Sequence, residues 1–532
     1  VQMSKRALLS MQYVSGGIYA APDNGYDAIW VRDTTNAVVF PALCGDLQYL
    51  KRWAPYLMNN PTAVDWKNKK YKSFLQYVPS DQNQCWQQDG TFYSILSAYA
   101  YWKLTADNSQ LEKWYSLAKD AIEFINASAY DNEMGLYYEW YINEAPMKTA
   151  HDWENTTHWN PYIKAMKIND IWPMYMYTIY INNSLYNSFI MLAEMAEQLK
   201  LENEKEIFLH QADKLASSID QHLYDNENKR YIPGIAKMEN GEKITVDWNY
   251  WDIYFDYVWA FTLHPQAADP QKAFASLDNM LNNRNGIFPG LDNKLYFSPA
   301  RPHASYIYSA MGQFDKAQTC LQRITERADD INLEQPSDVI YAMKGAIPER
   351  VDTISGHRPQ TFTAGPYLYG AASLAFIMDY HGITICPSGY MTKAENICMV
   401  DSVFTIDPTY YKNPCGLIFD DKNIPYSLKL PSKYNKPGKH SISILDTEKP
   451  ITPLLKYTCF ELIDIKTKNE SIIYDLKGFG NGILRFDSSV SKDCISVKNA
   501  GNNMDFRFWQ DGNSSFIQVN SRGKFTLNIK QK

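Results

Sequence analysis

One carboxylate in this sequence stands where it could accept a proton. Glu349 follows Pro348 and precedes Arg350, and the turn Ser355-Gly356 comes shortly after it. A carboxylate beside a guanidinium is expected to stay ionised, because the positive charge favours its charged form. An ionised carboxylate can activate a water molecule as a general base. Glu349 is therefore the candidate base, and a surface ion pair with Arg350 is the structural alternative.

The candidate general acid lies among carboxylates that stand close to indole rings. Asp152 and Glu154 flank Trp153, and Asp170 stands two residues before Trp172. A carboxyl group against an indole loses hydration, which raises its pKa and suits it to donate a proton. The alternative is an ordinary polar loop with a packed tryptophan. The residues leave the choice among Asp152, Glu154 and Asp170 open.

A third segment offers groups that bind hydroxyls. Trp30, Arg32 and Asp33 supply a stacking ring, a forked donor and an acceptor. The structural alternative is that Arg32 and Asp33 cap a helix that starts near Thr34. We expect these three residues to bind substrate. Gln88 and Asp89 open another predicted helix, and we expect them at the same end of the molecule as further substrate-binding residues.

Aromatic residues are unusually frequent, with 14 Trp and 39 Tyr. Many of them neighbour Asp, Glu or Asn, as Trp248 and Trp251 do in segment 247–252. Sugars need this mixture, because their C–H faces stack on rings and their hydroxyls need oriented donors and acceptors. Core packing is the alternative for any single ring. Trp153, Trp248 and Trp251 are therefore further candidates for substrate binding.

A pair of carboxyl groups is what glycoside hydrolysis requires. In the inverting version one group protonates the leaving oxygen and the other activates water, about 6.5–9.5 Å apart. The two groups need not be close in the sequence, because loops of a barrel can bring them together. The sequence thus predicts an enzyme that cleaves carbohydrates.

The elements that must position these residues are mainly helical up to about residue 385. Apolar residues recur at helical spacing over 185–199 and 207–223. Similar segments lie near 33–57, 90–105, 111–127, 254–263, 270–283, 303–311, 314–327 and 364–380. Repeated helical hairpins are typical of a toroid or solenoid, with functional loops gathered at one end. We expect residues 1–385 to form the catalytic domain.

The pattern changes after Gly382 to short β-favouring runs. The turn clusters 435–438 and 478–482 are expected to separate strands. Residues 386–532 are predicted to form a β-sandwich-like accessory domain. Trp509 in this domain is either part of a sugar-binding surface or packed in a core or against the other domain.

Five short motifs, in chain order, resemble glycoside hydrolase family 15, the glucoamylase-like group of the six-hairpin glycosidases. They are 17–22, 29–33, 88–90, 152–154 and 348–356. Segment 297–306 resembles the family's late helical hairpin, and it adds Arg301 to the candidate substrate-binding residues. The resemblance implies a mainly α fold, an (α/α)6 barrel, with no metal or cofactor. It implies inverting exo-hydrolysis that releases glucose from non-reducing ends of α-linked chains. It also implies that Arg32 and Asp33 hold the terminal sugar, that the Trp-Glu carboxylate is the acid and that Glu349 is the base.

Three other functions remain open. The chain is alternatively another six-hairpin glycosidase, such as an α-mannosidase or trehalase-like enzyme. A disaccharide phosphorylase would use phosphate in place of activated water, and Glu349 argues against it because phosphorolysis needs no base there. A sugar-binding module without catalysis is the third alternative.

Composition restricts the partners. The net charge of −7 and the lack of a Lys/Arg tract disfavour a nucleic acid. No apolar run is long enough to span a membrane, and none of the eight Cys forms the Cys-x-x-Cys pair of a zinc site. The expected partner is an oligosaccharide or polysaccharide. Residues 1–6 lack the apolar core of a secretion signal, so a secreted or periplasmic location is expected from the function alone. Nothing in the sequence predicts the oligomeric state.

Overall fold

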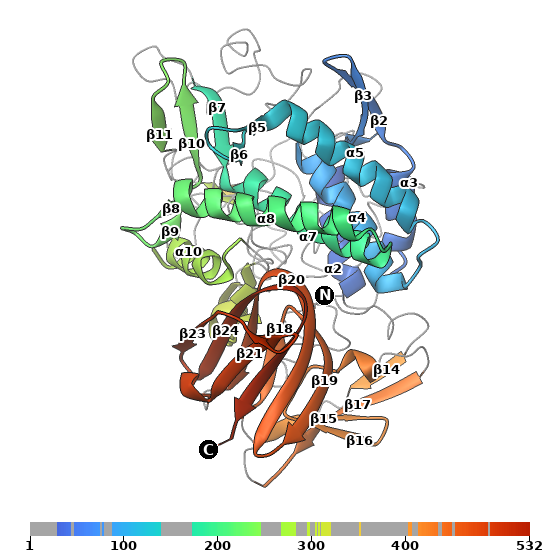
Figure 1. Cartoon of the computed structure of the whole chain (residues 1–532), viewed down its shortest axis with the longest axis vertical. Helices are drawn as coiled ribbons and strands as arrows, with labels where there is room; N and C mark the ends of the chain where they lie inside the picture. Colours follow the sequence, from blue (N-terminus) through green and yellow to red (C-terminus); the bar gives the residue numbers. More distant parts are fainter. Residues whose placement is uncertain are drawn as a thin grey trace.

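The helices, with short strands among them, form one part of the molecule, and the C-terminal strands form a second part that lies against it (Figure 1). The computed structural model describes residues 29–43, 47–74, 77–78, 88–139, 173–245, 268–283, 295–297, 304–305, 307–308, 310–320, 350–352, 403–406, 413–434, 439–448, 453–487 and 490–531.

The helices are arranged as antiparallel pairs. The pairs are α2 (Val31–Leu43) with α3 (Leu50–Met58), α4 (Gln88–Thr105) with α5 (Leu111–Ala129), and α7 (Ile179–Gln198) with α8 (Glu202–His222). Helices α4 and α7 are buried almost all round, whereas α8 buries one stripe that includes Phe208, Ala212 and Leu215. A helix buried on every side belongs to the interior, and an amphipathic helix covers it. Accordingly α2, α4 and α7 form an inner layer, which α3, α5 and α8 cover.

The predicted helical hairpins are confirmed where the structure describes them. Helix α10 (Pro270–Asn283) has the bounds expected from its periodicity. Helical residues also occur at 304–305, 307–308, 310 and 314–320, inside the two segments expected there. The segments 254–263 and 364–380 lie outside the described residues. A complete six-hairpin barrel and the boundary at 385/386 thus stay predictions.

Short β-hairpins, which the sequence analysis missed, follow each covering helix. They are β2 (Thr62–Trp66) with β3 (Lys69–Ser73), β5 (Tyr130–Asp131) with β6 (Leu136–Tyr137), and β8 (Tyr224–Asp225) with β9 (Arg230–Tyr231). The last two share the sequence Tyr-Asp-Asn-Glu. In both, the aspartate accepts a backbone N–H two residues on, from Glu133 at 2.8 Å and from Glu227 at 2.9 Å.

These two hairpins are each bound to the next helix that the structure describes. The N–H of Tyr137 donates to Asn182 of α7 at 2.8 Å, and that of Tyr231 donates to Ser276 of α10 at 2.8 Å. The two hairpins therefore make equivalent contacts.

A three-stranded antiparallel sheet stands at the start of α7. Its order is β11 (Lys243–Thr245), β10 (Gly234–Met238) and β7 (Pro173–Thr178). Strand β7 runs directly into α7, and the Thr178 side chain caps the helix by accepting the N–H of Ile181 at 3.2 Å. The sheet therefore lies at the N-terminal end of this inner helix.

The C-terminal part is β-rich, as predicted. One sheet has the order β14 (Val403–Ile406), β17 (Lys439–Asp446), β15 (Pro414–Phe419) and β16 (Lys422–Pro425). The other has the order β18 (Leu455–Thr458), β20 (Ser471–Asp487), β24 (Ser514–Lys530), β21 (Ile495–Asn499) and β22 (Asn502–Asn503). In this sheet β19 (Glu461–Lys468) also pairs with β20, and β23 (Phe506–Asp511) pairs with β24. Trp509 is half-buried and stacks on Phe516, with ring centroids 5.0 Å apart.

The turn expected at 478–482 is wrong, because β20 runs through it as one strand of 17 residues. Its glycines allow close approach of other groups. A Cβ on Gly478 or on Gly482 would lie 2.4 Å from the ring of Phe460, and one on Gly480 would lie 2.6 Å from the hydroxyl of Tyr186. Glycine inside a strand often marks such a contact. The other expected turn, 435–438, lies outside the described residues.

The helical and β-rich parts share a polar seam around Asn481 of β20. Its N–H donates to the Tyr186 hydroxyl of α7 at 2.9 Å, and its side chain donates to the carbonyl of Ala268 at 2.5 Å. Asp269, which follows Ala268, accepts a hydrogen bond from the Gln518 side chain at 3.2 Å and forms an ion pair with Arg507. The β-rich part is therefore bound to α7 and to the start of α10.

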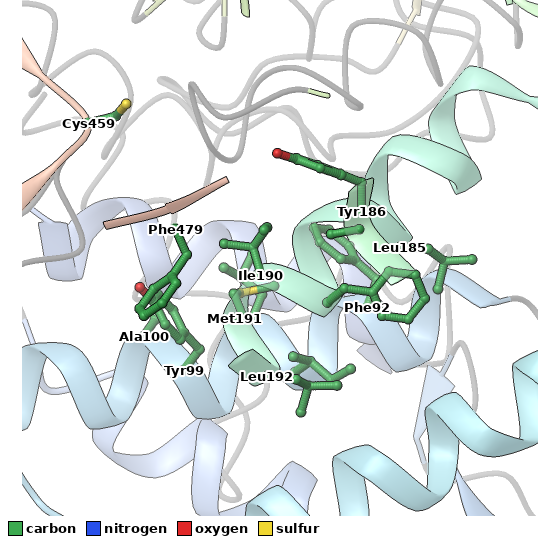
Figure 2. Packing of buried hydrophobic residues seen from close by; sticks show 14 of the residues in the cluster. Phe92, Tyr99, Ala100, Leu185, Tyr186, Ile190, Met191, Leu192, Cys459 and Phe479 are labelled. Atoms are coloured by element: carbon green, nitrogen blue, oxygen red, sulfur yellow. The ribbon is translucent and has the colours of Figure 1, made fainter. Parts of the chain in front are cut away.

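Buried apolar residues cross this seam as one cluster. Figure 2 draws Phe479 of β20, Ile190 of α7 and Tyr99 of α4 among its members. A shared core predicts that the two parts unfold together.

Replacing Gly480 by Ala is expected to destabilise the protein more than replacing Gly501. Both glycines have positive φ, +72° and +87°, so both variants carry the backbone strain of about 1–2 kcal/mol. Only the new methyl at 480 meets other atoms, Tyr186 at 2.6 Å and Ile190 at 2.8 Å. Such overpacking costs about 1–3 kcal/mol more. Urea unfolding of both variants measures the difference in stability. Equal losses of stability would contradict the close packing of Gly480 against α7.

Candidate functional site

Three inner helices bring polar side chains together at their N-terminal ends. Arg32 lies in the first turn of α2, Asp89 is the second residue of α4 and Tyr180 is the second residue of α7. The Arg32 Nη1 atom lies 2.9 Å from the Asp89 Oδ2 atom, and the Tyr180 hydroxyl donates to the same oxygen at 3.3 Å. Asp89 thus joins residues from all three helices.

Further contacts show that α2 and α4 run in the same direction. The hydroxyl of Thr35 lies 2.9 Å from that of Ser97, so positions deeper in α2 meet positions deeper in α4.

The same holds for α4 and α7. At their far ends the Tyr99 hydroxyl donates to Glu194 at 2.8 Å, and Lys103 lies 3.5 Å from the same carboxylate. The cluster around Asp89 consequently occupies one end of a layer of parallel helices, and Glu194 marks the opposite end.

Burial separates the two members of the ion pair. The side chain of Asp89 is 1% exposed and that of Arg32 is 19% exposed. The carboxylate is therefore covered and holds the guanidinium, which reaches the surface of the site. Tyr93 lies next to them, with its hydroxyl 3.5 Å from that of Tyr180. Burial raises the pKa of Tyr93 well above its ordinary value, so it stays a neutral phenol.

Two opposite charges meet in the part of the cluster that the structure describes. The N-terminal ends of parallel helices carry partial positive charge, which adds to that of Arg32, and Asp89 opposes both. The neutral phenol of Tyr93 and the hydroxyl of Tyr180 lie beside the ion pair. Together these groups present oriented donors and acceptors, which suits a ligand rich in hydroxyls.

The structure begins α2 at Val31, before the expected Thr34, and pairs Arg32 with Asp89. The helix begins earlier than expected because the short strand β1 (Ile29–Trp30), which pairs with β4 (Tyr77–Val78), leads directly into it. Trp30 is half-buried in this strand. The side chain of Asp33 lies outside the described residues.

Gln88 is buried at the start of α4, and its side chain donates to the carbonyl of Tyr138 at 2.7 Å. The structure thus brings segment 29–33 and residues 88–89 to one end of the helices. It adds Tyr93 and Tyr180, which the sequence analysis did not single out.

Tyr180 was missed because the expected helix began at residue 185 rather than 179. The adjacent Asn182 and Asn183 give the segment the composition of a loop. In the structure Asn182 is buried, and its side chain donates to the carbonyls of Thr178 and Tyr137 at 2.8 and 2.9 Å. Buried asparagines with such partners extend the helix. A strand-like run ending in Thr178, a good N-cap residue, is the signal that would have placed the start correctly.

Most of the expected catalytic and binding residues lie outside the described residues. They are Glu349, Asp152, Glu154, Asp170, Trp153, Trp248, Trp251 and Arg301.

The chain next to two of them is described. Strand β12 (Leu295–Phe297) pairs with β13 (Arg350–Asp352), and Phe297 is opposite Arg350. Glu349 directly precedes Arg350, and Arg301 follows Phe297 by four residues. The chain therefore leads to both residues from the same end of this antiparallel ladder. The segment 297–306, which the sequence analysis compared with a helical hairpin, thus begins with the last residue of a strand.

Among the described side chains, no three His, Cys, Asp or Glu residues group together as metal ligands. In the same part of the chain, none of the helices combines the length and the apolar character that crossing a membrane demands.

No family model and no curated protein matches the chain. The chain is similar to several solved structures. One is a cellobiose 2-epimerase from Bacillus thermoamylovorans, with a TM-score of 0.44 and 12% identity over 71% of this chain and 97% of that one. A second is a GH76 α-mannanase from Bacteroides thetaiotaomicron, with a TM-score of 0.43 and 14% identity over 70% and 94%. A third is a bacterial glucoamylase in complex with acarbose, with a TM-score of 0.45 and 14% identity over 71% and 55%.

Proposed function

We propose that this protein is a glycoside hydrolase of the six-hairpin type. It releases glucose from the non-reducing ends of α-linked glucosides or oligosaccharides, with inversion of the anomeric centre. The observation that supports the proposal best is the cluster of Arg32, Asp89 and Tyr180 at the N-terminal ends of parallel helices.

This cluster suits the terminal sugar. A guanidinium held by a buried carboxylate offers forked N–H donors whose direction is set before the ligand arrives. Donors that are already oriented need no rearrangement when the ligand binds. The exposed fraction of Arg32 leaves it accessible to sugar hydroxyls. Asp33, Trp30, Trp153, Trp248, Trp251 and Arg301 are proposed to complete the binding site, and the buried Gln88 supports it through its hydrogen bond to Tyr138.

In the proposed reaction Glu349 removes a proton from water, and the water oxygen attacks the anomeric carbon. The acid, which is Glu154, Asp152 or Asp170, protonates the glycosidic oxygen as the bond to it breaks.

A substrate panel tests the proposal. The purified protein is given maltose, longer α-linked glucosides, trehalose and α-mannosides, with and without inorganic phosphate. Free glucose from the α-glucosides, independent of phosphate, is the expected product. Release from trehalose or mannosides alone would favour another six-hairpin glycosidase, and dependence on phosphate would favour a phosphorylase. Sugar binding without turnover would favour a binding module.

The Asp89→Asn variant is expected to lose about 100-fold in kcat/KM, because Arg32 loses the charge that orients it, a loss equivalent to about 2.7 kcal/mol. Glu194→Gln is the matched control, since Glu194 is also a buried carboxylate that joins α4 and α7 but lies at their opposite end. Both variants should lose about 1–3 kcal/mol of stability. Only Asp89→Asn should lose activity, and equal kinetic losses in the two variants would contradict the placement of the site.

A further inference from the structure

Two tyrosine rings form a half-buried pair beside the candidate site. Tyr138 directly follows β6, and its carbonyl accepts the hydrogen bond from Gln88 at 2.7 Å. Tyr175 belongs to β7, the strand that runs into α7. The ring centroids lie 4.6 Å apart and the planes are tilted by 39°. Both residues are half-buried, so neither is fully enclosed by the protein.

The surrounding contacts hold this pair in place. The Tyr138 hydroxyl donates to the carbonyl of Ser128. Tyr177, two residues beyond Tyr175 on the same face of β7, donates to Asp131 of β5 at 2.5 Å. These bonds join the β5–β6 hairpin to the sheet that carries Tyr175. Rings fixed before binding lose little conformational freedom when a ligand stacks on them.

The pair lies within reach of the cluster around Asp89. Tyr175 precedes Tyr180 by five residues, a span of at most roughly 17 Å even for an extended chain. Tyr138 is bound to Gln88, the neighbour of Asp89. An oligosaccharide can span such a distance.

We propose that Tyr138 and Tyr175 form a distal sugar-binding subsite, which stacks on a sugar unit at least two places beyond the one that Arg32 holds. This inference rests on the proposed function and names its substrate class, chains longer than a disaccharide. Packing between the hairpin and the sheet is the alternative role of the pair.

Tyr175→Ala is expected to lower kcat/KM for maltotetraose about five- to tenfold, the effect of losing one aromatic contact, and to leave kcat/KM for maltose unchanged. Tyr175→Phe keeps the ring and should behave like the unchanged protein. Tyr224→Ala is the control, because Tyr224 is half-buried and also belongs to a ring pair. Its ring centroid lies 5.2 Å from that of Tyr231 in the equivalent hairpin β8–β9. It should change neither value.

Equal losses on both substrates, or no loss on maltotetraose, would overturn the subsite. Calorimetric binding of maltotetraose gives a second reading when Tyr175→Ala is combined with Glu349→Gln, which removes hydrolysis, and a Kd equal to that of Glu349→Gln alone would also overturn the subsite. Lack of hydrolysis by the unchanged protein would instead reject the proposed function, so the two failures are distinguishable.

Discussion

Glu349→Gln is expected to lower turnover of α-glucosides by at least about 1,000-fold, near the upper part of the range for a general base. Glutamine has nearly the same shape as glutamate but cannot accept the proton of the attacking water. KM should change little, because the amide still fills the space of the carboxylate. Steady-state kinetics and the urea unfolding midpoint measure the two effects, and the midpoint should stay unchanged.

Glu123→Gln is the control for that variant. Glu123 is an exposed carboxylate on α5 that pairs with Lys69 at 3.0 Å, far in sequence from the proposed acid and base. Glu123→Gln should hydrolyse α-glucosides at the rate of the unchanged protein. A Glu349→Gln protein that retains more than about a tenth of its activity would remove Glu349 from the role of base.

One of the variants Asp152→Asn, Glu154→Gln and Asp170→Asn is expected to lose about 1,000-fold on maltose and far less on α-glucosyl fluoride. Fluoride leaves without protonation, so its departure does not need the acid, whereas a sugar alkoxide does. The ratio of the two rates therefore identifies the acid among three residues that the sequence leaves open.

Glu349→Gln provides the comparison for this experiment, because loss of the base should slow both substrates alike. If all three acid variants lose the same factor on maltose and on the fluoride, none of them protonates the leaving group. That outcome would contradict the proposed pair of carboxylates.

Local patterns predicted the helices well where burial follows a regular spacing. The periodicity of segment 270–283 predicted the observed bounds of α10. The buried apolar stripe on α8 is the one expected of a covering helix. The start of α7 was misplaced because the buried Asn182 donates to the carbonyl of Tyr137, which is distant in sequence, and composition does not reveal such a partner. Hairpins such as β5–β6, with two residues in each strand, are too short to show an alternating pattern.

Contacts between distant segments were the hardest to predict. The glycines at 478–482 were assigned to a turn because their role depends on Phe460 and Tyr186, which only the tertiary structure brings near. Similarly, motifs at 29–33 and 88–90 were expected at one end of the molecule, but the direct pairing of Arg32 with Asp89 requires the register between α2 and α4. Tyr180 joins the cluster from a third helix and carries no motif of its own.

The configuration of the first sugar released tests the central claim most directly. Maltose or maltotetraose is hydrolysed in an NMR tube, and the anomeric proton signals are followed before mutarotation mixes them. A base that activates water on the face opposite the leaving group predicts that β-glucose accumulates first from the α-linked substrate. Initial release of α-glucose would contradict inversion, and with it the proposed role of Glu349.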